Sequence, residues 1–240
     1  MIVDKGHPIV PKRSNCKIVA IVCSALQLSM CGFAVFEAVL AAITGVIGVY
    51  TNAEIISALV ITVLASLLMA AQSAYAFYGM LVSHKTLKHI GLAWVAYPIV
   101  AVLTRLSISY LDHARSLFLS DDVQREVNFF GVMGNSIVLL ICFAIGIVLM
   151  LYAKGKLSDK RIVMCLSGAA YVISVALSAF QYISFYTQIG NFQMLMTIAA
   201  VTSITITLSS NFITYGAPFF LALSMKNTSE RNIGEDHALS

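Results

Sequence analysis

Two charged side chains stand alone inside long apolar segments, and they are the residues best placed to do chemistry. Glu37 is the only charged residue in the apolar run 18–53, and Arg105 is the only one in the apolar segment 90–111. A charge at the centre of a lipid bilayer costs at least about 2.5–3.5 kcal/mol, so it tends to mark a functional position. We therefore take Glu37 and Arg105 as the first candidates for substrate binding.

The depths of these two residues predict that they lie at a similar level of the membrane. At 1.5 Å per residue, Arg105 lies roughly 24 Å beyond His89. Lys17 favours the inner interface, which leaves Glu37 near the outer boundary. The two side chains could pair across the first and third helices and line an outward-facing cavity for a zwitterionic or charged solute. Two alternatives stay open: the pair only fixes helix register, or each side chain reaches the outer interface separately.

Neutral amide side chains form a second set of substrate-binding candidates. Each lies inside a predicted membrane span, where an amide must find a partner on another helix or in a cavity. These residues are Gln27, Gln72, Asn135, Gln181 and Asn211.

The last apolar segment carries hydroxyl groups along one face. Ser203, Thr207, Ser210 and Thr214 follow a 4-3-4 spacing, which puts them on one side of a helix. Such a face can line a water-filled path. Alternatively, the hydroxyl groups bond back to their own helix and allow close packing.

Small residues recur at four-residue spacing in two other segments and predict close helix contacts. One ridge consists of Ala34, Ala38 and Ala42, and the other of Ala170, Ser174 and Ser178. Ridges of this kind let helices approach closely, either within one chain or between subunits.

Several classes of function are disfavoured by what the sequence lacks. It contains no Walker sequence, no Ser-His-Asp pattern and no metalloprotease motif, so we expect neither an enzyme nor a bound cofactor. The five cysteines show no CxxC spacing and no disulfide framework, and no metal site is expected. No basic tract favours nucleic-acid binding.

The composition indicates that lipid surrounds most of the chain. Of the 240 residues, 59% are hydrophobic and 11% are charged, whereas a soluble domain carries about 25% charged residues. Backbone groups in hydrocarbon must bond within their own segment, so the long apolar runs are predicted to be helices. The six predicted spans are 18–50, 55–82, 90–111, 127–153, 162–186 and 192–225.

The first apolar run is predicted to remain as an uncleaved helix. Gly32-Phe33-Ala34 resembles a signal-peptidase site, but the run continues to Tyr50, far beyond the roughly 7–15 apolar residues of a signal peptide. If it is wholly helical, the run also exceeds the roughly 30 Å hydrocarbon core. Part of it must then protrude, bend or pack against protein.

The placement of basic residues predicts the orientation in the membrane. Twelve of the fifteen Lys and Arg residues lie in the N-terminal segment, the second loop, the fourth loop and the tail. The positive-inside rule places these parts, and both termini, in the cytoplasm. On the other side, the acidic segment 112–127 holds a predicted helix start near Asp122, and its carboxylates could alternatively bind a divalent cation.

The chain is therefore predicted to be an all-α integral membrane protein without a soluble domain. It should form a compact bundle of six transmembrane helices with short loops. A cytoplasmic basic segment (1–17) precedes the transmembrane domain (18–225), and a cytoplasmic polar tail (226–240) follows it. We expect a multi-pass protein of the plasma membrane, in contact with the lipid bilayer and open to another membrane subunit or a small-molecule solute as partner.

In outline, this prediction is similar to the substrate-binding subunits of energy-coupling-factor importers. The similarity consists of six helices, cytoplasmic ends and an alanine ridge on the first helix. It implies a small solute-binding transporter or the membrane subunit of one, and it carries no binding residue over. The alternative is a non-transporting membrane component, such as an assembly, immunity or sensory partner, in which the polar residues serve helix packing.

Overall fold

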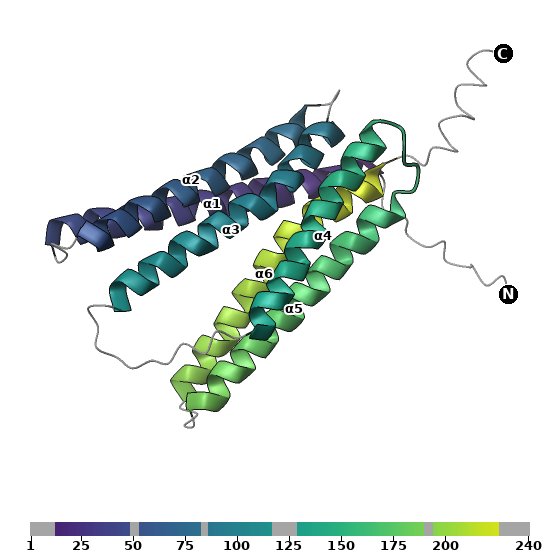
Figure 1. Ribbon diagram of the computed structural model, residues 1–240. Helices are drawn as coiled ribbons and strands as arrows, with labels where there is room; N and C mark the ends of the chain where they lie inside the picture. Colours follow the sequence, from purple (N-terminus) through teal and green to yellow (C-terminus); the bar gives the residue numbers. More distant parts are fainter. Residues whose placement is uncertain (1–12, 49–52, 83–85, 117–128, 190–193, 226–240) are drawn as a thin grey trace, which may run out of the picture.

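The structure is a computed structural model that describes residues 13–48, 53–82, 86–116, 129–189 and 194–225 (Figure 1). These residues form six helices, which confirms the all-α prediction for the described part of the chain. The helices are α1 (Arg13–Gly48), α2 (Ala53–Leu81), α3 (Thr86–Ser116), α4 (Phe129–Ala153), α5 (Arg161–Ile189) and α6 (Met194–Ser224).

Every one of the six helices is long and apolar enough to cross a membrane. The mean hydropathy of the candidate spans runs from 1.3 in α6 to 2.8 in α4. The protein is therefore a polytopic membrane protein. Helix α1 begins inside the predicted basic segment 1–17, because a helix can continue past the lipid boundary where water solvates its basic side chains.

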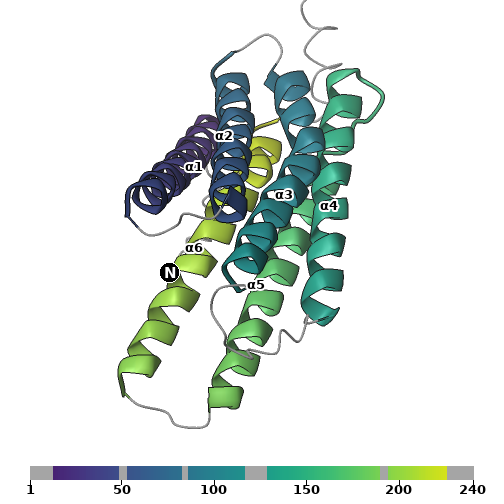
Figure 2. The same ribbon diagram turned by 60° about the vertical axis from the view of Figure 1, so that its left-hand side comes forward.

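The helices form a closed ring in chain order. Each helix packs against the next one along the chain, and α6 packs back against α1. Figure 2 shows α1, α2, α3 and α4 side by side, so that α2 lies between α1 and α3. This neighbour order decides which polar residues can meet.

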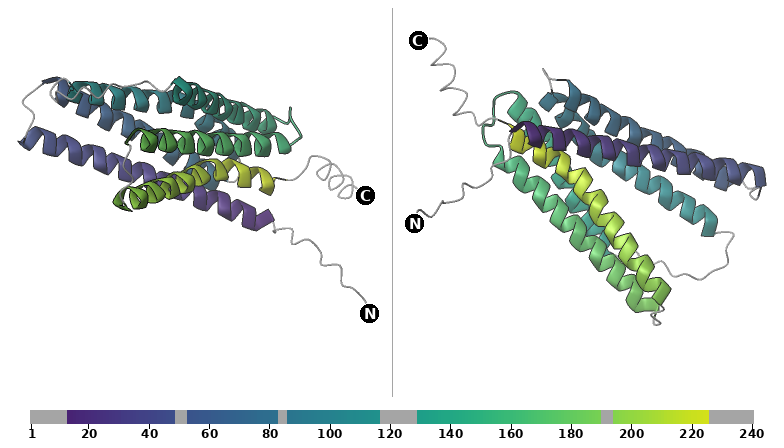
Figure 3. Two further views of the ribbon diagram at one scale, coloured as in Figure 1. Left: turned by 90° about the horizontal axis from the view of Figure 1, so that it is seen from below. Right: turned by 180° about the vertical axis from the view of Figure 1, so that it is seen from behind.

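The ring divides into two halves that separate toward one end of the molecule. Helices α1–α3 form one half and α4–α6 the other, and the two halves converge where α1 begins and α6 ends (Figures 1 and 3). We call this the basic end, because Lys17, Lys88 and Lys160 lie at the helix termini there. The opposite end, where the halves diverge, is the splayed end. Which side of the membrane each end faces remains a prediction.

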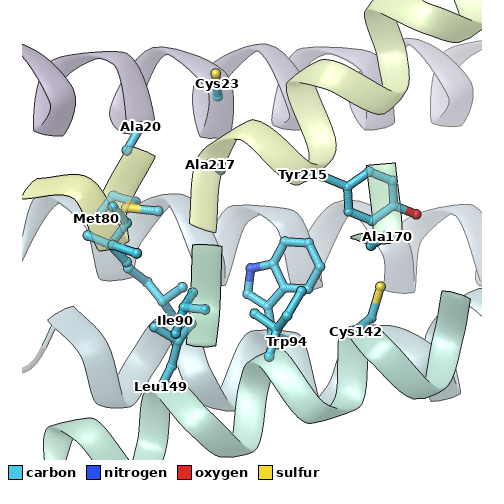
Figure 4. Packing of buried hydrophobic residues seen from close by; sticks show 14 of the residues in the cluster. Ala20, Cys23, Met80, Ile90, Trp94, Cys142, Leu149, Ala170, Tyr215 and Ala217 are labelled. Atoms are coloured by element: carbon cyan, nitrogen blue, oxygen red, sulfur yellow. The ribbon is translucent and has the colours of Figure 1, made fainter. Parts of the chain in front are cut away.

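The main hydrophobic core joins the two halves near the basic end. Trp94 of α3 lies beside Cys142 of α4 and Tyr215 of α6, and Ala20 and Cys23 of α1 belong to the same cluster (Figure 4). The Trp94 ring lies 6.3 Å from the Tyr215 ring, measured between centroids. The contacts between the halves are thus concentrated at the basic end.

Two glycines let the backbones of α3 and α4 touch within this core. A Cβ atom added to Gly146 would lie 2.6 Å from the Val95 nitrogen and 2.8 Å from the Gly91 oxygen. A Cβ atom added to Gly91 would lie 3.0 Å from the Gly146 oxygen. No side chain fits at either position without moving backbone, so both glycines serve close helix approach.

The loop between α4 and α5 is fixed by local hydrogen bonds at the basic end. Gly155 has a φ of 69° and ends α4 in a Schellman motif, in which Lys156 N–H donates to the Leu151 carbonyl at 3.0 Å. Asp159 Oδ1 accepts from the backbone N–H of Arg161 at 2.9 Å and caps α5. The Lys160 ammonium donates to the Met225 carbonyl at 2.9 Å, which ties the start of α5 to the end of α6.

The two small-residue ridges behave differently. In α5, Ala170 is fully buried and the Ser174 hydroxyl donates to the Tyr215 hydroxyl of α6 at 3.1 Å, so this ridge packs within the chain. In α1, Ala42 packs against the small cluster that α2 and α3 form at the splayed end. Ala34, in contrast, is exposed. The first ridge is therefore only partly a packing surface.

Candidate functional site

A cavity lined by both polar and apolar side chains lies between α1, α2, α3 and α6, one turn beyond the main core toward the splayed end. Its volume is about 240 Å³. Seven of its lining residues have polar side chains or a thiol: Gln27, Cys31, Ser66, Tyr97, Thr104, Ser210 and Thr214. The remaining lining residues are Met30, Ala34 and Met69. Met30 and Ala34 are exposed, so the cavity is open rather than sealed.

Helical periodicity explains why these residues converge. Gln27, Cys31 and Ala34 are spaced by four and three residues, which places them on one face of α1. Ser210 and Thr214 are spaced by four on α6, and Tyr97 and Thr104 by seven on α3. Ring closure between α1 and α6 then brings these faces together.

Most of the polar side chains around the cavity have no hydrogen-bond partner among the described residues. The side chains of Gln27, Ser66, Tyr97, Ser210 and Thr214 make no hydrogen bond to another residue in the described ranges. No described side-chain nitrogen or oxygen is both fully buried and unpaired, so these groups are open to the cavity. Polar groups in a membrane protein that find no partner within the chain are available to water or a ligand.

The predicted hydroxyl face of the last helix divides into two parts. Toward the splayed end, the hydroxyl groups of Thr205, Thr207 and Ser209 donate to backbone carbonyls of their own helix at 2.8–2.9 Å. Nearer the core, Ser210 and Thr214 line the cavity instead. Bonding back to the helix is therefore confirmed for Thr207, whereas a water-filled path along Ser210 and Thr214 stays a prediction.

Gln72 has a structural place rather than one in the cavity. It is buried, and its side-chain nitrogen donates to the Ala93 carbonyl of α3 at 3.0 Å. Ser73 donates to the Gln72 side-chain oxygen at 3.4 Å, and the Cys31 sulfur lies 3.2 Å from the Ser73 hydroxyl. This chain of contacts joins α1, α2 and α3 directly behind the cavity wall.

Arg105 and Asn135 meet across the boundary between the two halves. The Arg105 guanidinium on α3 donates to the Asn135 side-chain oxygen on α4 at 3.1 Å. Asn135 lies seven residues before the fully buried Cys142 and so shares the inner face of α4. Arg105 follows Thr104, which lines the cavity. Arg105 itself is exposed and is not among the residues that line the cavity.

The ion pair between Glu37 and Arg105 that the depth argument allowed is absent between these two described residues. Helix α2 separates α1 from α3, and Arg105 bonds to Asn135 instead. Glu37 is exposed on α1, one turn beyond Ala34. Depth along the membrane was a guide to level, but it carries no information about which helices are neighbours.

For the remaining candidate residues, the structure provides little evidence about a role in binding. Asn211 is half-buried on α6, and its side chain makes no hydrogen bond within the described part of the chain. The side chain of Gln181 and residues 117–127 of the acidic segment 112–127 lie outside what the structure describes. Among the described residues, no three His, Cys, Asp or Glu side chains come together as a metal site.

Sequence reasoning missed four cavity residues: Cys31, Ser66, Tyr97 and Thr104. Single hydroxyl or thiol groups are common in packed membrane helices, so Ser66 and Cys31 carried no signal. Thr104 did carry a signal in the sequence, because it precedes the intramembrane Arg105. Tyr97 precedes Pro98 in mid-span, away from the interfacial belts where tyrosine is expected.

A second cavity, of about 160 Å³, lies between α5 and α6. Its lining is aromatic and apolar, with Tyr171, Phe212, Phe219 and Phe220 around two glycines. Such a lining fits hydrocarbon and offers no group that would select a polar solute. The four-helix cavity is therefore the candidate site. Comparison of the chain with protein families, curated proteins and solved structures finds no match.

Proposed function

We propose that the protein binds a small polar solute inside the membrane, in the cavity between α1, α2, α3 and α6. The observation that carries this proposal is the set of unpaired polar groups on four helices around one open space. A cluster of neutral donors and acceptors in a low-dielectric setting favours a ligand that satisfies them, because unpaired polar groups there are costly.

The size of the cavity limits the solute. The volume of about 240 Å³ is slightly below the range of about 300–1,000 Å³ found for pockets that hold drug-sized ligands. A compact molecule with several hydrogen-bonding groups fits this space, whereas a nucleotide or a peptide does not. The role is one of binding rather than catalysis, since the lining holds no acid–base pair.

The shape of the bundle supports transport as the use of this site. The halves are in contact at the basic end and apart at the splayed end (Figure 3), and the cavity lies between these two regions. A site near mid-membrane between two helical units that rock against each other is the arrangement that alternating access requires. With the basic end in the cytoplasm, this form is open to the outside, in the plasma membrane.

The proposal can be tested by a substitution that fills the cavity with a larger side chain. The protein would be purified from its native membrane and its bound small molecules identified by mass spectrometry, for the wild type and for Ala34→Phe. We expect a solute with the wild type and at least a tenfold loss in the variant, because the new ring occupies the cavity.

Ala71→Phe is the matched control, because exposed Ala71 lies on the opposite side of α2 from the cavity residues Ser66 and Met69. It should retain the solute. A wild-type protein that carries a stoichiometric protein partner and no solute would favour the non-transporting alternative.

A further inference from the structure

An open apolar groove lies between α5 and α6, which run side by side (Figure 3). It is the cavity of about 160 Å³ described above, and all of its lining residues lie within the candidate membrane spans of the two helices. Phe212 in its wall is 49% exposed, and a Cβ atom added to Gly168 would meet nothing within 4 Å. The groove is therefore open at the surface of the bundle, at a depth where lipid surrounds the chain.

The lining of the groove offers contacts to hydrocarbon, because its polar groups are already used. The Ser167 hydroxyl donates to the Val163 carbonyl at 2.8 Å, and the Tyr215 hydroxyl accepts from Ser174 at 3.1 Å. An apolar cavity of about 150 Å³ holds one benzene molecule. A groove of about 160 Å³ therefore accommodates a short stretch of an acyl chain.

The aromatic rings of the groove hold one another in place. The Phe212 ring lies edge-on to two others, at centroid distances of 6.3 Å from Tyr171 and 6.2 Å from Phe220. Phe219 lies 5.6 Å from Phe220 in the same edge-on manner. Phe212 and Phe220 are eight residues apart, or about 12 Å along α6. The aromatic wall thus follows the helix axis, which is the direction in which acyl chains lie in a bilayer.

A positive charge lies on the same face of α5, beyond the basic end of the groove. Arg161 precedes Gly168 by seven residues, which places it two turns, or about 10 Å, nearer the basic end. The Arg161 side chain is exposed and makes no ion pair with a described residue. Asp159, the nearest acid in sequence, accepts from the Arg161 backbone N–H instead. Lys154 and Lys156 in the preceding loop are also exposed.

We propose that an anionic phospholipid binds between α5 and α6 at the basic end. One acyl chain occupies the groove between Tyr171 and Phe212, and the phosphate lies at the Arg161 guanidinium. Basic pockets between transmembrane helices on the cytoplasmic side bind anionic headgroups in this manner, and the basic end is predicted to face the cytoplasm. The lipid site is separate from the four-helix cavity, since the two share no lining residue.

Native mass spectrometry can test the preference for an anionic headgroup. The purified protein in detergent micelles would be titrated with phosphatidylglycerol and with phosphatidylcholine that carries the same acyl chains. We expect the first phosphatidylglycerol to bind at least fivefold more tightly, because one basic residue near the membrane surface raises the affinity for anionic lipid about fivefold. Equal affinities for the two lipids overturn the proposal.

Arg161→Gln tests whether this charge holds the headgroup. The substitution should lower the affinity for phosphatidylglycerol about fivefold and leave that for phosphatidylcholine unchanged. Lys88→Gln is the matched control, because Lys88 is an exposed cation at the basic end of α3, a helix that contributes nothing to the groove. It should change neither affinity. An equal loss in both variants would mean that the basic end attracts anionic lipid as a whole, and would overturn a site at Arg161.

Gly168→Leu tests whether the groove holds the acyl chain. The new side chain enters open space, so it should leave helix packing intact and weaken the binding of both lipids at least tenfold. Gly32→Leu on α1 is the control, because a Cβ atom there also meets nothing within 4 Å, and it should bind both lipids as the wild type does. Unchanged lipid binding by Gly168→Leu overturns the acyl-chain site.

Photo-cross-linking provides a readout without any substitution. Phosphatidylglycerol with a diazirine in one acyl chain should form adducts on the α5 and α6 peptides that line the groove, and unlabelled phosphatidylglycerol should compete with it. Adducts spread evenly over the six described helices overturn the site.

The mass spectra also distinguish a lipid from a protein in the groove. If the wild type gave the mass of a dimer and Gly168→Leu did not, a second copy of the chain would fill the groove, and the lipid proposal would be wrong.

Discussion

The basic end and the splayed end of the bundle solve the problem of helix packing differently. At the basic end, side chains from all six helices share one core, and the backbones of α3 and α4 touch at Gly91 and Gly146. At the splayed end, the first half keeps a small cluster of its own, centred on Ile55 and Leu111. One end therefore holds the halves together, while the other leaves room for polar side chains to face a shared space.

This contrast indicates where stability and function reside. Lipid tails are as apolar as the side chains they contact, so packing rather than the hydrophobic effect holds membrane helices together. Substitutions that disturb packing should therefore cost most at the basic end. Substitutions at the cavity should change binding and leave stability nearly unchanged.

The largest effect is expected from Gly146→Ala. The added methyl group would meet the backbone atoms of α3, which cannot rotate away, so overpacking should cost about 1–3 kcal/mol, near the upper limit. Gly32→Ala is the control, because nothing lies within 4 Å of its new methyl group, and it should stabilise the protein slightly. Denaturant titration in micelles measures both. A stable Gly146→Ala protein would mean that the two halves are not in contact there.

An intermediate effect is expected from Leu149→Ala. Leu149 is 0% exposed at the basic end of α4, whereas Leu140 on the same helix is 69% exposed. Moving a leucine side chain between lipid and the protein interior changes the free energy little. The loss should therefore come mainly from the cavity that the substitution leaves, and it should lower the free energy of unfolding by about 2 kcal/mol. Leu140→Ala, measured in the same titration, should change the free energy of unfolding by less than about 0.5 kcal/mol. If both variants lost a similar free energy of unfolding, the assignment of Leu149 to the core and of Leu140 to the lipid-facing surface would be wrong.

The smallest effect is expected from Gln72→Leu. This change removes the hydrogen bond to the Ala93 carbonyl, and such bonds in membrane proteins contribute about 0.6 kcal/mol on average. Gln27→Leu is the matched control, because Gln27 makes no hydrogen bond to a described residue and should affect stability little. The two variants should reverse their order in solute retention, with Gln27→Leu the weaker binder. If the two variants had the same stability and the same solute retention, the distinction between a structural Gln72 and a solute-binding Gln27 would be wrong.

Much of the architecture could be predicted from the sequence, because lipid restricts a spanning chain to a few forms. The long apolar runs predicted six helices, and the amides Gln72 and Asn135 were expected to find partners on other helices, which they do. The arrangement of the helices around the ring was not predictable. Hydropathy fixes the level of a residue in the membrane, but every helix has the same apolar outer surface and gives no sign of its neighbours.

The candidate site illustrates the same limit at the level of side chains. Gln27, Ser210 and Thr214 were recognisable as polar residues in spans, but their convergence depends on the contact between the first and the last helix. Glu37 and Arg105 were predicted to lie at one level of the membrane, but α2 packs between their helices. Such relations are long-range, and no local pattern encodes them.

The position of Trp94 has a practical consequence. It is the only tryptophan of the chain, and its ring lies 5.5 Å from Tyr97 in the cavity wall and 6.3 Å from Tyr215 in the opposite half. Its ultraviolet emission therefore arises from the junction itself, without interference from any other indole. Native fluorescence can therefore report on packing at this junction in real time, with no label attached.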